Sequence, residues 1–171
     1  KIKPDYAEAY YNRGNAFFEL KKIESAITSY DKAIQIKPDY AEAYNNHGNA
    51  LRKLKKIESA ITSYDKAIQI KPDYAEAYYN RGNTFIELKK IESAIANYDK
   101  TIQIKPNYAE AYNNRGSALL ELKKIESAKE SYDKAIQIKP DYAEAYNNRG
   151  TTLLDLNKID DAFQDYNKAI Q

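Results

Sequence analysis

Asparagine side chains form the most regular set of groups with hydrogen-bonding chemistry in this sequence. One asparagine recurs every 34 residues, within the segments "AYYNRG", "AYNNHG" and "AYNNRG". This first asparagine series comprises Asn12, Asn46, Asn80, Asn114 and Asn148. Three residues later lies a second polar series, which comprises Asn15, Asn49, Asn83, Ser117 and Thr151. Residues three apart on a helix lie on one face, and a carboxamide offers both a donor and an acceptor to a peptide amide.

Residues for catalysis or metal binding are scarce. The chain has no cysteine, which excludes disulfides, thiolate nucleophiles and cysteine-based metal sites. Its single histidine, His47, stands where the other copies have arginine, and each glycine is solitary, unlike the glycines of a phosphate-binding loop. The Asp and Glu residues recur at helix-surface spacing, as solvated or capping groups do. We therefore expect no enzyme, no metal and no cofactor.

The charge balance limits the classes of partner. Lys and Arg number 27 and Asp and Glu 25, so no net field favours nucleic acid or an anionic membrane. No apolar run approaches the roughly 18–20 residues of a membrane span, and no signal peptide opens the chain. We expect a cytoplasmic protein with neither nucleic acid nor a membrane as partner. Because the sequence begins at Lys1 and not Met, we interpret it as a processed form or a fragment.

The elements that carry the asparagines repeat with the same period. The five prolines lie 34 residues apart, from Pro4 to Pro140, and the five glycines do the same, from Gly14 to Gly150. Such a period predicts a stacked repeat architecture, compatible with either a young duplication or an engineered array. We predict a single array over 1–171, with the repeats 7–40, 41–74, 75–108, 109–142 and a truncated 143–171, and with 1–6 as the tail of a preceding repeat.

Each repeat has helical signals in both halves. Asp39 followed by Glu42 predicts a capping box at a helix start. The same pair recurs at Asp5/Glu8, Asp73/Glu76, Asn107/Glu110 and Asp141/Glu144. The second half, from Ile23 to Ile36, carries a broad apolar stripe at helical spacing and ends before a proline.

Periodicity alone also permits one helix of about 30 residues per repeat, because neither Gly nor Pro separates the two halves. The width of the stripe and its alanines Ala26 and Ala33 favour close packing of two helices over a coiled-coil seam. Gly14 would also be a weak point in one long helix. We predict two helices per repeat.

Several residues at fixed places resemble the tetratricopeptide repeat family, namely Tyr10, Gly14, Ala26, Tyr30 and Pro38 in the first copy. The resemblance implies an all-α, right-handed superhelical solenoid of stacked antiparallel helix pairs, whose two helices approach most closely at Gly14 and Ala26. One departure is a basic series where leucine is common in the family. This basic series comprises Arg13, His47, Arg81, Arg115 and Arg149. We expect its stems to lie along apolar surface and its charged heads to reach water.

The resemblance also implies that the first helices of the pairs line a concave groove. Both polar series would then form a ladder along it, with Tyr11, Tyr79 and Arg52 as further groove residues that differ between copies. On this interpretation the chain is a non-catalytic protein–protein interaction scaffold that binds an extended peptide or partner segment. The alternative for the asparagines is a purely structural role.

Two other functions stay open. The last repeat ends in an apolar surface that comprises Leu153, Leu156, Phe163 and Ile170. This surface predicts head-to-tail self-association as a structural or assembly module. The chain is also compatible with the substrate-binding repeat region of a larger enzyme.

Overall fold

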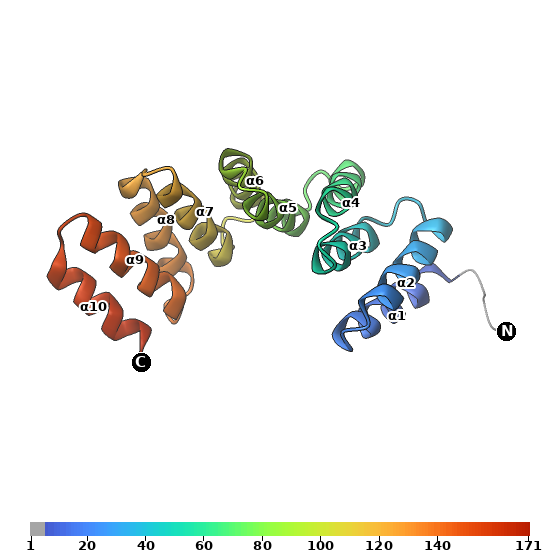
Figure 1. Cartoon of the computed structure of the whole chain (residues 1–171), viewed down its shortest axis with the longest axis horizontal. Helices are drawn as coiled ribbons and strands as arrows, with labels where there is room; N and C mark the ends of the chain where they lie inside the picture. Colours follow the sequence, from blue (N-terminus) through green and yellow to red (C-terminus); the bar gives the residue numbers. More distant parts are fainter. Residues whose placement is uncertain (1–5) are drawn as a thin grey trace. The chain divides into compact units, whose positions relative to one another are not determined.

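The computed structural model describes residues 6–171, which contain ten α-helices and no strand (Figure 1). The helices are α1 (Ala7–Glu19), α2 (Ile23–Ile36), α3 (Ala41–Lys53), α4 (Ile57–Ile70), α5 (Ala75–Glu87), α6 (Ile91–Ile104), α7 (Ala109–Glu121), α8 (Ile125–Ile138), α9 (Ala143–Asp155) and α10 (Ile159–Ala169). None is longer than 14 residues. The prediction of two helices per repeat is therefore confirmed, and the single long helix is wrong.

A left-handed residue follows the first helix of each pair, and it is lysine in four repeats and asparagine in the fifth. Lys55 has φ 59°, its N–H donates to the Arg52 carbonyl at 2.9 Å, and the Lys56 N–H donates to the Leu51 carbonyl at 3.0 Å. These two bonds are those of a Schellman C-cap, a motif that usually carries glycine at the left-handed position. The same φ recurs at Lys21, Lys89, Lys123 and Asn157. Because a lysine takes the place of glycine, the sequence shows no breaker between the two halves.

A β-turn precedes the first helix of repeats 2 to 5, and it shows that the capping box predicted there is wrong. The Tyr40 N–H donates to the Lys37 carbonyl at 3.2 Å, so Pro38 and Asp39 are the two central residues of a turn. The N-cap is then Tyr40, with no side-chain cap hydrogen bond. Asp73, Asn107 and Asp141 lie in the same place, two residues before the helix, whereas Asp5 lies outside the described residues.

Two glutamates of the expected boxes pair instead with the lysine that follows the second helix of their own repeat. Glu42 accepts from Lys71 at 3.4 Å, and Glu110 pairs with Lys139 at 4.0 Å. These are exposed pairs, and such pairs typically contribute about 0–1 kcal/mol.

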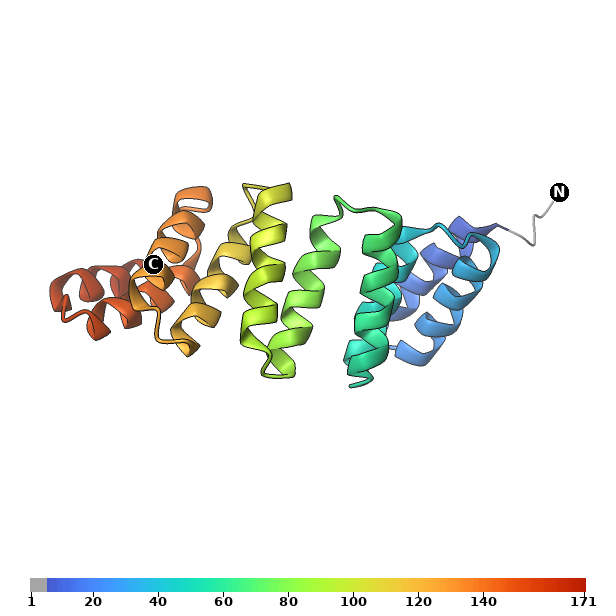
Figure 2. The same cartoon turned by 90° about the horizontal axis from the view of Figure 1, so that it is seen from above.

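The chain divides into two compact units, Lys1–Thr84 and Phe85–Gln171. In unit 1, α1 packs on α2, α3 on α4, and α2 on α3, as Figure 2 shows from above. The core joins Ala26, Tyr30 and Ala50, all almost fully buried, with Phe17 and Ile27 packed against them. Side chains from α1, α2 and α3 thus share one cluster, which holds successive pairs together.

Unit 2 repeats this arrangement. There α7 packs on α8 and α9 on α10, while α6 contacts α7 and α8 contacts α9 (Figure 2). Leu119, Ala128 and Tyr132 form its buried cluster, with Ile95 and Leu120 against it. Both units are stacks of consecutive helix pairs, as the all-α fold class predicts.

The repeated glycine makes room for a tyrosine ring. A Cβ atom built on Gly14 would lie 2.5 Å from the Tyr30 ring, and one on Gly48 would lie 2.7 Å from the Tyr64 ring. The predicted close approach at glycine is therefore between the first helix and an aromatic ring of the second. This ring fills the space, and its hydroxyl continues past the glycine toward the face that carries the asparagines.

Candidate peptide-binding site

Four residues of the second polar series lie at the tip of a buried or half-buried tyrosine from their own repeat. The Tyr30 hydroxyl donates to Asn15 Oδ1 at 2.8 Å, and Tyr64 donates to Asn49 Oδ1 at 2.8 Å. In unit 2 the equivalent pairs are Ser117–Tyr132 at 3.1 Å and Thr151–Tyr166 at 3.2 Å. The glycine, the tyrosine and the polar residue of a repeat therefore pack as one cluster. The tyrosine hydroxyl orients the amides of Asn15 and Asn49.

The first asparagine series makes hydrogen bonds between successive repeats. Asn80 Nδ2 donates to Asn45 Oδ1 at 3.0 Å, and Asn148 Nδ2 donates to Asn113 Oδ1 at 3.0 Å. The acceptors are buried, Asn113 completely so. Bonds of this kind tie α5 to α3 in unit 1 and α9 to α7 in unit 2.

Repeat 1 has Tyr11 where repeats 2 and 4 have these buried asparagines. Asn46 Nδ2 therefore donates to the Tyr11 hydroxyl at 3.1 Å and to Asn15 Oδ1 at 2.9 Å. The Tyr11 ring packs against Tyr40 with ring centroids 5.0 Å apart. Asn12, which has no such neighbour in the described residues, is exposed.

A pocket of about 370 Å³ in unit 1 brings part of the predicted site together. It is lined by Asn15, Phe18, Glu19, Tyr30, Asn46 and Asn49, from α1, α2 and α3. Three predicted residues therefore meet in one cavity, and Phe18, Glu19 and Tyr30 complete its walls. The other predicted residues of unit 1, Tyr11, Asn12, Arg52, Tyr79, Asn80 and Asn83, do not line it. Asn114 and Asn148 lie in unit 2, half-buried on α7 and α9.

The electrostatics of this pocket keep Tyr30 protonated. Burial, with smaller contributions from Tyr11 and from the Glu19 carboxylate, raises the pKa of Tyr30 well above its ordinary value. The Tyr30 hydroxyl therefore stays protonated near neutral pH, where it donates to Asn15 Oδ1. Glu19 itself is exposed and lies close enough to act on Tyr30.

The basic series corrects a further expectation, because its charged groups pair with neighbouring repeats. Arg115 Nε donates to Asp99 at 2.6 Å, and Arg81 pairs with Asp65. These aspartates recur with the same period, 16 residues before Arg81, Arg115 and Arg149, which is the signal that could have revealed the pairing. Arg13 is the member whose side chain is exposed, and it donates to Ser29 at 3.1 Å.

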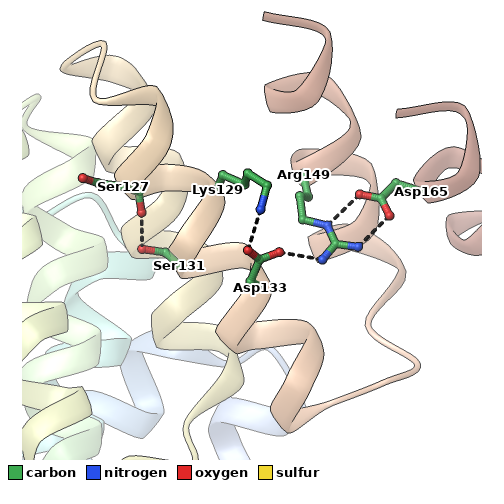
Figure 3. A network of polar contacts seen from close by, with 6 residues as sticks. All are labelled: Ser127, Lys129, Ser131, Asp133, Arg149 and Asp165. Carbon is green, nitrogen blue, oxygen red and sulfur yellow. Dashed lines mark hydrogen bonds and ion pairs between the residues drawn. The ribbon is translucent and has the colours of Figure 1, made fainter. Parts of the chain in front are cut away.

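Arg149 forms the most extensive of these networks (Figure 3). It donates twice to Asp165 on α10 at 2.7 Å and once to Asp133 on α8 at 2.6 Å, while Lys129 also donates to Asp133 at 2.8 Å. Burial alone would raise the pKa of Asp133, but the bonds from Lys129 and Arg149 outweigh it and leave that pKa lowered. The pKa of Arg149 is itself raised, chiefly by its hydrogen bonds to Asp165.

His47 is the member of the basic series in repeat 2, where the other repeats have arginine. Its Nδ1 lies 3.0 Å from Ser63 Oγ and its Nε2 lies 3.3 Å from Asp31. Burial lowers the pKa of His47, and Asp31 only partly counteracts this. The contacts assign His47 to the packing between repeats.

A second pocket, of about 340 Å³, lies in unit 2 between charged side chains. It is lined by Tyr112, Arg115, Glu130, Ser131, Asp133 and Lys134. None of these belongs to the predicted site, and Arg115 and Asp133 are already paired. Residues 6–171 contain no cluster of metal-ligating side chains and no helix long and apolar enough to cross a membrane.

Solved structures similar to this chain share its fold over nearly its whole length. A crystal structure of MamA is 26% identical with a TM-score of 0.83, over 92% of each chain. MamA from Desulfovibrio magneticus RS-1 is 20% identical with a TM-score of 0.86, over 99% of this chain and 96% of that one. YrrB, described as a TPR protein with an unusual peptide-binding site, is 23% identical with a TM-score of 0.77, over 97% and 86%.

The sequence comparisons locate the family along the chain. No curated protein sequence matches significantly. The family model described as "TPR repeat" matches residues 14–54, 48–89, 82–123 and 116–156, and the one described as "Tetratricopeptide repeat" matches 143–171. These matches together cover most of the sequence and both units. The chain therefore belongs to the tetratricopeptide repeat family.

Proposed function

We propose that this chain is a non-catalytic scaffold that binds an extended peptide segment of a partner protein on the face formed by α1 and α3. Repeats of this family typically serve protein–protein interaction. The observation that carries the proposal is the pocket of unit 1, where Asn15, Asn46 and Asn49 meet the Phe18 ring. Such a pocket combines an apolar wall with a few placed polar groups, as ligand sites do.

The neighbouring residues of unit 1 extend this proposed face. Tyr11 and Asn80 hold the amides in position through their own hydrogen bonds, and Arg52, Tyr79 and Asn83 are half-buried on α3 and α5. Because the residues equivalent to Tyr11, Tyr79 and Arg52 differ between copies while the framework does not, we propose that these three influence ligand choice. The peptide-binding site described for YrrB supports the same kind of ligand for this fold.

A two-step experiment tests the proposal. The full chain is first screened against an array of random dodecapeptides, and the tightest hits are then titrated into ¹⁵N-labelled protein. We expect chemical-shift changes at Asn15, Phe18 and Asn49, including the side-chain NH₂ signals. An array without binders, or shifts confined to helices other than α1 to α5, would contradict peptide binding at this site.

The second candidate function is head-to-tail self-association, which an exposed apolar face on α10 favours. Phe163 and Ile170 of the expected apolar end are 67% and 82% exposed, and Ile159 beside them is 64% exposed, whereas Leu153 is buried. A second copy could cover this face with the first helix of its own array. Light scattering across a concentration series tests this candidate, with Phe163→Glu as the disrupting variant. A monomer at the highest concentration would contradict it.

A further inference from the structure

The pocket of unit 1 has a more specific chemistry than a general peptide groove. We propose that it selects a peptide segment with a lysine or arginine side chain. Carbonyl oxygens of the segment accept hydrogen bonds from Asn15 and Asn49, and its cationic head lies at Glu19. This inference rests on the peptide binding proposed above. It adds that the ligand accepts hydrogen bonds from the pocket and carries a positive charge.

The tyrosines fix which end of each amide is available. Asn15 Oδ1 accepts from Tyr30 at 2.8 Å and from Asn46 at 2.9 Å, so both of its lone pairs have donors. Asn49 Oδ1 accepts from Tyr64 at 2.8 Å. Both residues keep the Nδ2 amino group for a ligand, which only donates, while Asn49 Oδ1 also keeps one lone pair. Two donors in one pocket call for acceptors on the ligand, and an extended peptide supplies these as backbone carbonyls.

Asn46 does not contribute a donor of this kind, although it also lines the pocket. Its Nδ2 is taken by Tyr11 at 3.1 Å and by Asn15, and its Oδ1 accepts from Asn45 at 3.1 Å. Its role is to hold Asn15 in the orientation that exposes the amino group.

Glu19 provides the charge selection. It lines the pocket, is exposed, and forms no ion pair within residues 6–84. The carboxylate attracts a cationic side chain and repels an acidic one, while the half-buried Phe18 ring beside it offers apolar surface to an aliphatic stem. An uncharged apolar side chain would contact Phe18 but would partly dehydrate Glu19 without compensation. Lysine and arginine satisfy both groups.

Three labelled probe peptides test the charge selection by fluorescence anisotropy. They share the tightest uncharged sequence from the array and differ at one central residue, which is lysine, norleucine or glutamate. We expect the lysine probe to bind about three- to fivefold more tightly than the norleucine probe, as for an exposed ion pair, and the glutamate probe to bind most weakly.

Two matched carboxylate variants identify the source of the preference. Glu19→Gln should abolish the difference between lysine and norleucine probes. Glu24→Gln removes the same charge from an exposed site on α2 outside the pocket and should preserve the difference.

The donor role is tested with Asn49→Ser, a change that the chain itself contains in another repeat. Ser117 keeps a 3.1 Å contact with Tyr132, so a serine at 49 can keep the contact with Tyr64 while it lacks the amino group. We expect an unchanged melting temperature and about fivefold weaker binding of both the lysine and norleucine probes. Ser117→Thr, which alters the equivalent pair in unit 2, should leave binding unchanged.

The outcomes separate the two proposals. Equal binding of lysine and norleucine probes, or equal effects of Glu19→Gln and Glu24→Gln, would overturn the selection for basic residues while peptide binding stands. Binding that Asn49→Ser does not weaken would overturn the donor assignment. No binding of any probe would overturn the peptide-binding proposal itself.

Discussion

Repeats 1 and 2 differ from repeats 4 and 5 in the residue at the tip of the buried tyrosine. Asn15 and Asn49 each use their oxygen on the tyrosine and keep an amino group, whereas Ser117 and Thr151 meet the tyrosine with their only polar atom. The tyrosine contact is common to both regions, so it belongs to the fold. The spare amino group occurs in the first region and belongs to the proposed site.

The largest expected effect is a loss of stability, and it tests the packing of glycine against the tyrosine ring, which both regions share. Gly48→Ala and Gly116→Ala each place a Cβ 2.7 Å from a tyrosine ring, at Tyr64 and Tyr132. Although alanine favours a helix by about 1 kcal/mol over glycine, overpacking typically costs about 1–3 kcal/mol and leucine would cost more. We expect both alanine variants to lose stability in urea unfolding by similar amounts. A stabilised variant in either region would show that the ring yields easily.

A smaller loss of stability distinguishes an asparagine that bonds to the preceding repeat from an exposed one. Asn148→Ala removes the donor to the buried Asn113 Oδ1, and an unsatisfied buried group typically costs about 1–3 kcal/mol. Asn12→Ala, at an exposed place of the same series, should change stability by less than about 0.5 kcal/mol. Equal effects in urea unfolding would contradict a structural role between repeats.

Removing a tyrosine hydroxyl sharpens the comparison between the regions. Tyr64→Phe leaves Asn49 Oδ1 without its donor, and Tyr132→Phe removes the hydroxyl that contacts the exposed Ser117. We expect each to cost about 0.5–1.5 kcal/mol, with the larger loss at Tyr64. Tyr64→Phe should also weaken peptide binding, because the amide of Asn49 can then rotate, whereas Tyr132→Phe should not. An identical binding loss in both variants would remove the distinction.

The smallest effect concerns pH and the basic series. Burial lowers the pKa of His47 in the folded chain, while the unfolded value stays at about 6.5. Below that value the unfolded state binds the proton first, so the stability that the neutral ring provides is lost as the pH falls. We expect the melting temperature to fall between about pH 7 and pH 5 and to fall less in His47→Arg. Parallel pH profiles of the two proteins would contradict this.

The fold was predictable because proline, glycine and tyrosine share one period, and repeated packing requires that regularity. Asp39 misled the prediction of the helix start because a Pro-Asp turn and an N-cap use the same residue types. Lys55 carried no signal for the left-handed C-cap, since lysine rarely adopts that conformation.

The site was only partly predictable. The amides of Asn15, Asn46 and Asn49 were expected to meet on one face, and they line one pocket. That Tyr30 reaches past Gly14 to take the oxygen of Asn15 depends on three-dimensional packing that helical spacing does not contain. The structure was therefore needed to show that the proposed site offers hydrogen-bond donors to a ligand.

A crystal structure of the full chain with the lysine probe tests the central claim most directly. We predict carbonyl oxygens of the peptide at about 2.7–3.2 Å from Nδ2 of Asn15 and Asn49, with the lysine ammonium at Glu19. A peptide held by Asn46 alone, or seated elsewhere with the pocket of unit 1 empty, would contradict it.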